Sequence, residues 1–391
     1  MSRLKWLFLL LCLLLASSAH GLLNDLIIIK SHTRLGYDSN VYNRTKGNET
    51  ETEYLEQIVS LSALLAQSDR TLFNLMYSPK FNYRFLDDHQ MTFQNFNTFF
   101  QRGLTPKLQL KSTYTYSVNE REPTSDLDLD ADITSENLKT TAQLSYTPNR
   151  KHTFVTKYEN KQKIWSENLP LGTGLTNGDY DQHRAELQYL YEVFHGQLFS
   201  TQSAAYTDHT YAGDRGKFIQ VALGQELLFV LSPTTYLTLK GGYSLTENTA
   251  EGAELPIKIY EPFIAGGLNT SPFKNLTLAL NLKHGLQDSS IAVFNVTKKT
   301  QGVAQIKYNV TPKITTIASI IGIRSEYTED YARNESGVAR IDYLLINTVN
   351  VVWEINRNHA IELGYQGPLM NPQSDLGVLR NKSYMGYRLT F

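Results

Sequence analysis

Charged and hydrophilic side chains recur at every second position in several segments of this sequence, and bases outnumber acids among them. Successive side chains of a β-strand point to opposite faces, so this spacing gathers such groups on one face of a sheet. Clustered ammonium and guanidinium groups attract anions, and the chemistry on offer is therefore electrostatic binding. The candidate residues are Lys107, Lys111, Lys139, Lys157, Arg184, Glu186, Lys240, Lys283, Lys307, Arg340, Asp342, Lys382 and Arg388.

Motifs for covalent or metal chemistry are missing from the sequence. It contains no GxSxG elbow, Walker loop, GxGxxG or HExxH. The acidic run 126–132 is similar to a calcium loop, but Ala131 stands where an EF-hand needs glycine. Weak divalent binding on a loop and an ordinary solvated loop both remain open for this run. We expect no cofactor, no metal site and no enzymatic activity.

Composition narrows the class of protein further. Of 391 residues, 41% are hydrophobic, with 24 Tyr and 17 Phe, which is too apolar for a disordered chain. No stretch after the N-terminal region is apolar for long enough to form a spanning helix. The net charge of −1 gives no global field that would favour nucleic acid.

The elements that must carry the charged face are strands. In the segment 276–283, for example, leucines at the even positions 276–282 alternate with Thr277, Asn281 and Lys283. Three places blur the pattern. Pro79 interrupts a long third strand, which places it near a rim or at a bulge. The segments 314–323 and 343–353 are apolar on both faces.

Short turns recur along the chain and alternate with longer polar loops. The turns are centred near residues 69, 106, 148, 195, 233, 272, 312 and 357, and in five of them Ser or Thr precedes Pro. The longer loops include 43–53, 120–135, 166–181, 247–256 and 367–379. Short turns on one rim and long loops on the other are typical of outer-membrane barrels.

The eight turns join sixteen strands, and one further strand at each end (about 32–42 and 380–391) makes eighteen. The pattern predicts an all-β, transmembrane, antiparallel up-and-down β-barrel over residues 32–391, with short periplasmic turns and long extracellular loops. A barrel of sixteen strands is the alternative. At about this size a barrel encloses an aqueous channel unless something fills it.

The N-terminus has the features of an export signal. Arg3 and Lys5 precede the apolar run 6–16, and small residues follow it, so cleavage is expected after Ala19 or Gly21. Residues 1–21 would then be the signal peptide, and 22–31 a short periplasmic segment. Cys12, the single cysteine, would leave with the signal, so the mature chain has neither a disulfide nor a thiolate.

The C-terminal strand carries a second export feature. Phe391 follows Leu389, Tyr387 and Gly386 in a spacing that resembles the signal read by bacterial barrel-assembly machinery. Together with Gly36–Tyr42 and the Ser/Thr-Pro turns, this chain resembles a family of outer-membrane β-barrel porins of Gram-negative bacteria. Some members of that family are encoded with exopolysaccharide genes. The resemblance implies residence in the outer membrane and offers no catalytic residues.

We therefore expect a channel for passive diffusion of small hydrophilic solutes, mildly anion-preferring, with a nearly unselective pore as the alternative. Two other functions stay open: a barrel component of an exopolysaccharide export or assembly system, and a closed surface barrel whose loops bind a partner. Loop 166–181 either folds inward as a constriction or packs at the surface. Expected partners are outer-membrane lipids and lipopolysaccharide, the barrel-assembly machinery, and small solutes or polysaccharide. Nucleic acid is not expected, and a homo-oligomer is left open.

Overall fold

The computed structural model describes residues 27–40, 50–68, 70–86, 89–120, 134–165, 179–211, 216–249, 255–288, 296–327, 340–367 and 380–391. Within these ranges every regular element is a β-strand, and no helix is long and apolar enough to cross a membrane. The strands are β1 (Ile27–Asp38), β2 (Thr52–Gln67), β3 (Thr71–Tyr77), β4 (Lys80–Arg84), β5 (His89–Thr105), β6 (Leu108–Glu120), β7 (Thr134–Asn149), β8 (His152–Trp165), β9 (Tyr180–Phe194), β10 (Leu198–Tyr211), β11 (Lys217–Ser232), β12 (Thr235–Thr249), β13 (Ile257–Phe273), β14 (Leu276–Asp288), β15 (Val296–Thr311), β16 (Ile314–Tyr327), β17 (Arg340–Glu354), β18 (His359–Gln366) and β19 (Lys382–Thr390).

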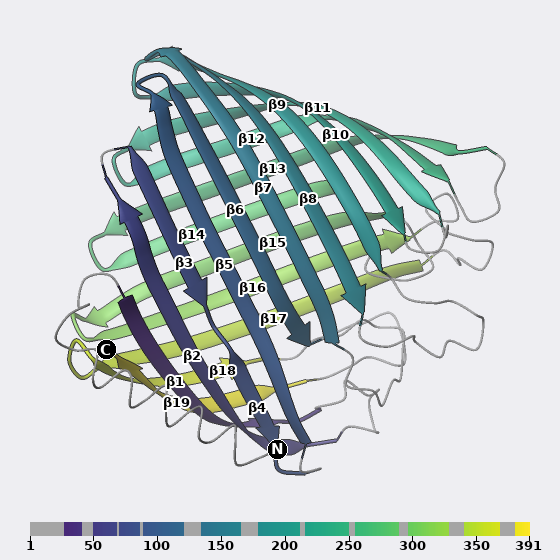
Figure 1. The fold of residues 1–391 in the computed structure, drawn as a ribbon. Coiled ribbons are helices and arrows are strands. Elements are labelled where there is room, and N and C mark those ends of the chain that lie inside the picture. Colours follow the sequence, from purple (N-terminus) through teal and green to yellow (C-terminus); the bar gives the residue numbers. More distant parts are fainter. Residues whose placement is uncertain are drawn as a thin grey trace.

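The strands form one closed antiparallel sheet. Apart from β3 and β4, strands that are neighbours in the sequence pair with each other, and β1 also pairs with β19, from Lys30 opposite Thr390 to Asp38 opposite Lys382. β3 and β4 share the same two neighbours, β2 and β5, so nineteen strands occupy eighteen positions. The predicted up-and-down barrel of eighteen strands is confirmed, and Figure 1 shows its strands running obliquely between the two rims.

Pro79 accounts for the break between β3 and β4. The register continues through it, because Leu61 opposes Tyr77 and Ile58 opposes Lys80. The amide of Val59 donates to the carbonyl of Pro79, whereas proline has no amide to donate in return. The expected position near a rim or at a bulge is wrong: Pro79 lies midway along a strand in unbroken register.

Side chains at the short turns explain the Ser/Thr-Pro pattern. The hydroxyl of Thr105 accepts hydrogen bonds from the amides of Lys107 and Leu108, at 3.2 and 3.1 Å. Thr311 does the same for the amides of Lys313 and Ile314. A hydroxyl before the turn thus accepts hydrogen bonds from two amides that follow it.

Two of the eight turns lie later in the sequence than predicted. β7 extends through Pro148 to Asn149, and β13 extends through Pro272 to Phe273. In the second case the amide of Ser271 donates to the carbonyl of Thr234, which keeps β13 paired past its expected end. β1 begins at Ile27 rather than near residue 32. The expected signal peptide, the acidic run 126–132 and most of loop 166–181 lie outside the described residues.

The ladder between β13 and β14 stops before the long-loop end of the barrel. Pairs extend from Phe273 and Leu276 to Ile264 and His284, although both strands continue beyond that last pair. Gly285 follows with φ of 150°, a conformation that L side chains rarely adopt. β14 therefore leaves the wall of the barrel at Gly285.

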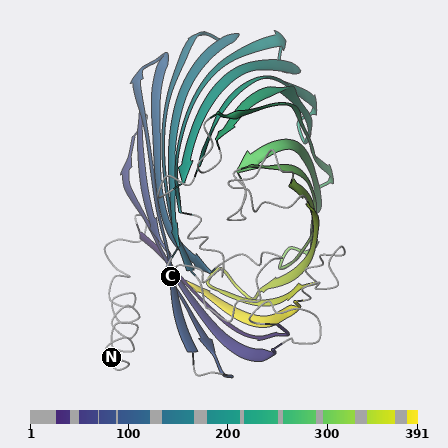
Figure 2. The same cartoon turned by 90° about the vertical axis from the view of Figure 1, so that its right-hand side faces the viewer.

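Beyond this point the ends of β14, β15 and β16 pack against the inside of the wall. We call residues 285–288, 296–299 and 324–327 the inner layer. Lys298, on the outward face of β15, forms an ion pair of 3.2 Å with Glu261, on the inward face of β13. Leu286 and Val296 join a buried apolar cluster with wall residues that include Phe218 and Ile259. Figure 2 shows the ends of the green strands inside the curve of the teal strands.

Candidate functional site

The two faces of the sheet differ in chemistry. Exposed leucines at alternate positions, such as Leu144, Leu187, Leu223 and Leu239, define the outer face. Within each strand, the side chains that alternate with these outward residues point into the barrel. An apolar outside and a charged inside are the reverse of a soluble protein, in which water is outside and apolar groups are buried.

Five of the sequence-predicted residues lie together on the inner face of β6 to β9. Lys111 opposes Gln143, Gln143 opposes Lys157, and Lys157 opposes Glu186. Lys139 and Arg184 share this face, because each is an even number of residues from a member of that row. The predicted alternation thus brings these groups onto one wall.

Three lysines surround the carboxylate of Glu159 on that wall. Its carboxylate lies 3.1 Å from Lys139, 3.3 Å from Lys161 and 3.7 Å from Lys157. Glu186 lies 3.3 Å from Arg184. Since one carboxylate is shared among three ammonium groups, the wall keeps an excess of positive charge.

The other predicted residues are spread around the interior or lie at its ends. Lys240, Lys283, Lys307 and Asp342 occupy inward positions of β12, β14, β15 and β17, and Arg340 begins β17 at an inward position. Arg388 lies 3.7 Å from Glu354 near the short-turn rim. Lys107 is an exception, because it lies in the turn between β5 and β6 rather than in a strand.

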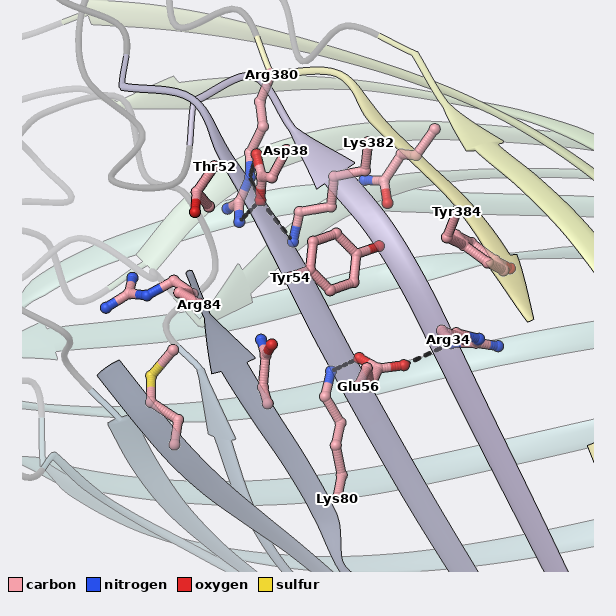
Figure 3. Close-up of a pocket in the computed structure, with 13 residues that line it drawn as sticks. Arg34, Asp38, Thr52, Tyr54, Glu56, Lys80, Arg84, Arg380, Lys382 and Tyr384 are labelled. Atoms are coloured by element: carbon pink, nitrogen blue, oxygen red, sulfur yellow. Dashed lines mark hydrogen bonds and ion pairs between the residues drawn. The ribbon is translucent and has the colours of Figure 1, made fainter. Parts of the chain in front are cut away.

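A cavity of about 190 Å³ lies on the inner face where β1, β2, β4 and β19 approach the long-loop rim (Figure 3). Its charged lining consists of the bases Arg34, Lys80, Arg84, Arg380 and Lys382 and the acids Asp38 and Glu56. Tyr54 and Tyr384 add aromatic rings. Five bases against two acids give the lining of this cavity an excess of positive charge.

Asp38 is held by two of these bases at the end of β1. Arg380 donates to both of its carboxylate oxygens, from Nε to Oδ1 at 3.0 Å and from Nη2 to Oδ2 at 2.6 Å, and Lys382 lies 3.3 Å from Oδ2. The fork of Arg380 fits the carboxylate in a bidentate manner, which fixes its orientation. Figure 3 shows Arg380 and Lys382 converging on Asp38.

Arg34 occupies the centre of a second ion-pair network. It lies 2.9 Å from Glu56, which also binds Lys80 at 2.5 Å, and 3.4 Å from Glu362. Its guanidinium lies 4.5 Å from the ring centroid of Tyr384, a cation–π distance. The network joins β1, β2, β4, β18 and β19, and thus crosses the junction that closes the barrel.

Of the residues that line this cavity, the sequence analysis named only Lys382 as a candidate. The signal for Arg34 and Asp38 was present, because they alternate with the outward Leu35 and Tyr37. What could not be read is which carboxylate each base meets, because Arg34 and Glu362 are 328 positions apart.

The C-terminal residues predicted as an assembly signal lie in the closing strand. Gly386 faces inward, where a β-carbon would lie 2.8 Å from Nε2 of His32. Tyr387 faces outward and is exposed. Leu389 opposes Ser31, and the amide of Phe391 donates to the carbonyl of Ile29 at 2.8 Å. These contacts give the motif a part in closing the barrel, whereas its recognition by assembly machinery remains a prediction.

Metal chemistry finds no support in the described part of the chain. No three His, Cys, Asp or Glu side chains there are grouped so as to hold a metal ion. The arrangement offers fixed charges around an enclosed space.

No model of a known protein family matches the chain, and no curated protein matches it in sequence. Several solved structures match it in fold. OccK2 (OpdF) from Pseudomonas aeruginosa, solved in complex with glucuronate, is 10% identical, with a TM-score of 0.49. The match covers 94% of this chain and 99% of the OccK2 chain. A BenF-like porin from Pseudomonas fluorescens Pf-5 gives 10% identity and a TM-score of 0.49, with 95% and 100% covered.

The siderophore receptor PirA from Pseudomonas aeruginosa is more distant, at 8% identity and a TM-score of 0.44, with 93% of this chain and 80% of PirA covered. These are likenesses in fold, and they assign neither a family nor a solute. The fold that the porin resemblance implied is confirmed by the strand pairing of this chain itself.

Proposed function

We propose that this protein is an outer-membrane channel through which small hydrophilic solutes diffuse passively, with a preference for anions. The observation that carries the proposal is the closed sheet of eighteen positions with an apolar outer face and a charged inner face. A closed barrel satisfies its backbone groups internally, which a sheet within lipid requires. A barrel of this size is wider than one filled by its own side chains.

The preference for anions rests on two basic sites. One is the wall around Glu159, where three lysines share one carboxylate. The other is the cavity at the long-loop rim, where bases exceed acids. Rings and rows of fixed charge select permeating ions by sign. We infer that the chain acts by binding and conduction rather than by catalysis.

Residence in the outer membrane, cleavage of residues 1–21 and recognition of the C-terminal strand by assembly machinery belong to the same proposal. Lipids, lipopolysaccharide and small anionic solutes are the partners that it implies. Export of exopolysaccharide and homo-oligomer formation have no specific observation in their favour.

The proposal is tested by single-channel recording of the refolded chain in planar bilayers, with the reversal potential measured under a salt gradient. Stable open steps with anion selectivity are expected. Stable steps with cation selectivity would keep the channel and refute the charge assignment. A folded barrel that never conducts would refute the channel.

A further inference from the structure

The split between β13 and β14 lies between a buried interface inside the barrel and an apolar groove on its outer face. On the inside, the outward side chains Leu286 and Val296 of the inner layer are buried together with Phe218 and Ile259 of the wall. His209, Thr246 and Asn248 of the wall are completely covered, as expected where a second layer lies over them. The region is therefore a packed interface between two sheets, not part of an open channel.

The β13–β14 ladder does not extend across this interface in the described residues. No β13–β14 pair forms beyond Ile264 and His284. The Lys298–Glu261 ion pair spans the two layers at 3.2 Å, and both side chains are partly exposed. An exposed ion pair contributes little, and apolar contacts are non-directional. The inner layer is thus held less specifically than any strand with a complete ladder.

The ladder ends where Gly285 of β14 comes next to Phe263 of β13. A β-carbon at Gly285 would lie 2.8 Å from the β-carbon of Phe263, so β14 passes close beneath that residue. The Phe263 ring occupies space left by Gly224, where a β-carbon would lie 2.7 Å from Cζ. Pro262, on the separated part of β13, has no amide with which to extend the ladder.

On the outer face, an apolar groove of about 520 Å³ leads to the same place. The groove is lined by small residues, among them Gly266, Gly302 and Gly322, and by leucine and isoleucine side chains. The volume lies within the range of small-molecule sites. Gly266 and Leu282, which line the groove, oppose each other two positions before the last β13–β14 pair, Ile264 and His284. The groove therefore ends next to the split.

We propose that the split is a lateral portal that admits the apolar chain of an anionic single-chain amphiphile, such as a long-chain fatty acid, from the membrane. The proposal rests on the proposed function, since it requires the barrel to lie in a membrane. The outer groove takes the chain, separation of the inner layer opens the interface, and the basic interior favours an anionic head. Segments 314–323 and 343–353 are apolar on both faces. On the inner face of the barrel, Ile321 lies opposite Ile346 and Ile323 opposite Leu344, so this part of the interior is apolar as well.

The test uses the refolded chain in liposomes with palmitic acid that carries a diazirine at its chain end. After irradiation, mass spectrometry locates the label. We expect label on the outer groove and also on the inward residues Phe218 and Ile259. A phospholipid with the same diazirine should label the groove alone, because its second chain and bulky head do not fit the interface.

A crosslink across the split then tests whether opening is required. In Glu261→Cys/Lys298→Cys, a short bifunctional thiol reagent replaces the ion pair; apart from Cys12, in the expected signal peptide, the sequence has no other cysteine. Because the crosslink removes the open state, the inward label should fall about tenfold. The matched control is Glu247→Cys/Lys258→Cys, an ion pair of 3.3 Å between β12 and β13, whose ladder is complete there.

Absence of inward label in the wild-type chain, or inward label that survives the crosslink, would overturn the portal. If the double variant does not fold, the wild-type labelling pattern decides alone. Conductance is recorded on the same preparations. A conducting barrel without inward label refutes only the portal, and a labelled barrel without conductance refutes only the channel.

Discussion

Replacement of Arg34 by glutamine tests whether the network at the barrel junction stabilises the fold. The variant loses the 2.9 Å contact with Glu56 and the 3.4 Å contact with Glu362. Orphaning a buried charge costs about 3–5 kcal/mol. Here both carboxylates keep other partners, since Glu56 retains Lys80 and Glu362 retains His32. We therefore expect the free energy of unfolding to fall by about 1–3 kcal/mol.

Arg388→Gln is the matched control, because it removes the same charge from the inner face of β19. Arg388 lies 3.7 Å from Glu354, whose side chain is 59% exposed. A solvated pair of this kind is worth about 0.5 kcal/mol or less. Urea titration of the refolded protein in liposomes, followed by tryptophan fluorescence, measures both variants. Equal losses for the two variants, or no loss for Arg34→Gln, would refute the assignment of Arg34 as the centre of the network.

Three further outcomes are expected. Lys157→Gln should shift the reversal potential towards cation selectivity, whereas the outward Lys258→Gln should leave it unchanged in the same bilayer assay. Gly242→Ala should lower the free energy of unfolding by about 1–3 kcal/mol, because the added β-carbon meets a backbone carbonyl and an aromatic ring. Gly302→Ala, with open space around its position, should cost less than about 0.5 kcal/mol. Thr311→Ala leaves two turn amides without their acceptor and should cost about 0.5–1.5 kcal/mol in the urea titration; an unchanged midpoint would show that water replaces the hydroxyl.

The barrel could be predicted from the sequence because its signals are local. Alternation depends on residues two apart, and the turns depend on Ser or Thr beside Pro, as at Thr105 and Thr311. The same locality explains the errors. Pro148 and Pro272 marked the ends of strands, yet hydrogen bonds to the neighbouring strand carry both strands beyond them. A local signal therefore locates a turn only to within two or three residues.

The charged site could be predicted only in part, because its members are brought together by closure. Sequence alternation placed Lys382 on the inner face, but nothing near it in the chain indicates Asp38 as its partner. The inner layer was beyond prediction for a different reason. Pro262 and Gly285 are visible in the sequence, but their joint effect depends on the register that sets β13 beside β14.

The junction between β1 and β19 also constrains how the protein is made. The first strand finds its second neighbour only after the last strand has been delivered, so the longest-range contacts form last. Until then β1 presents an unpaired edge, which invites association with other chains. Because Arg34 and Asp38 meet Glu362, Arg380 and Lys382 across this junction, the basic cavity is itself a product of that final step. A chain halted before β19 would lack the cavity as well as the seal, and solute binding there would report that assembly has been completed.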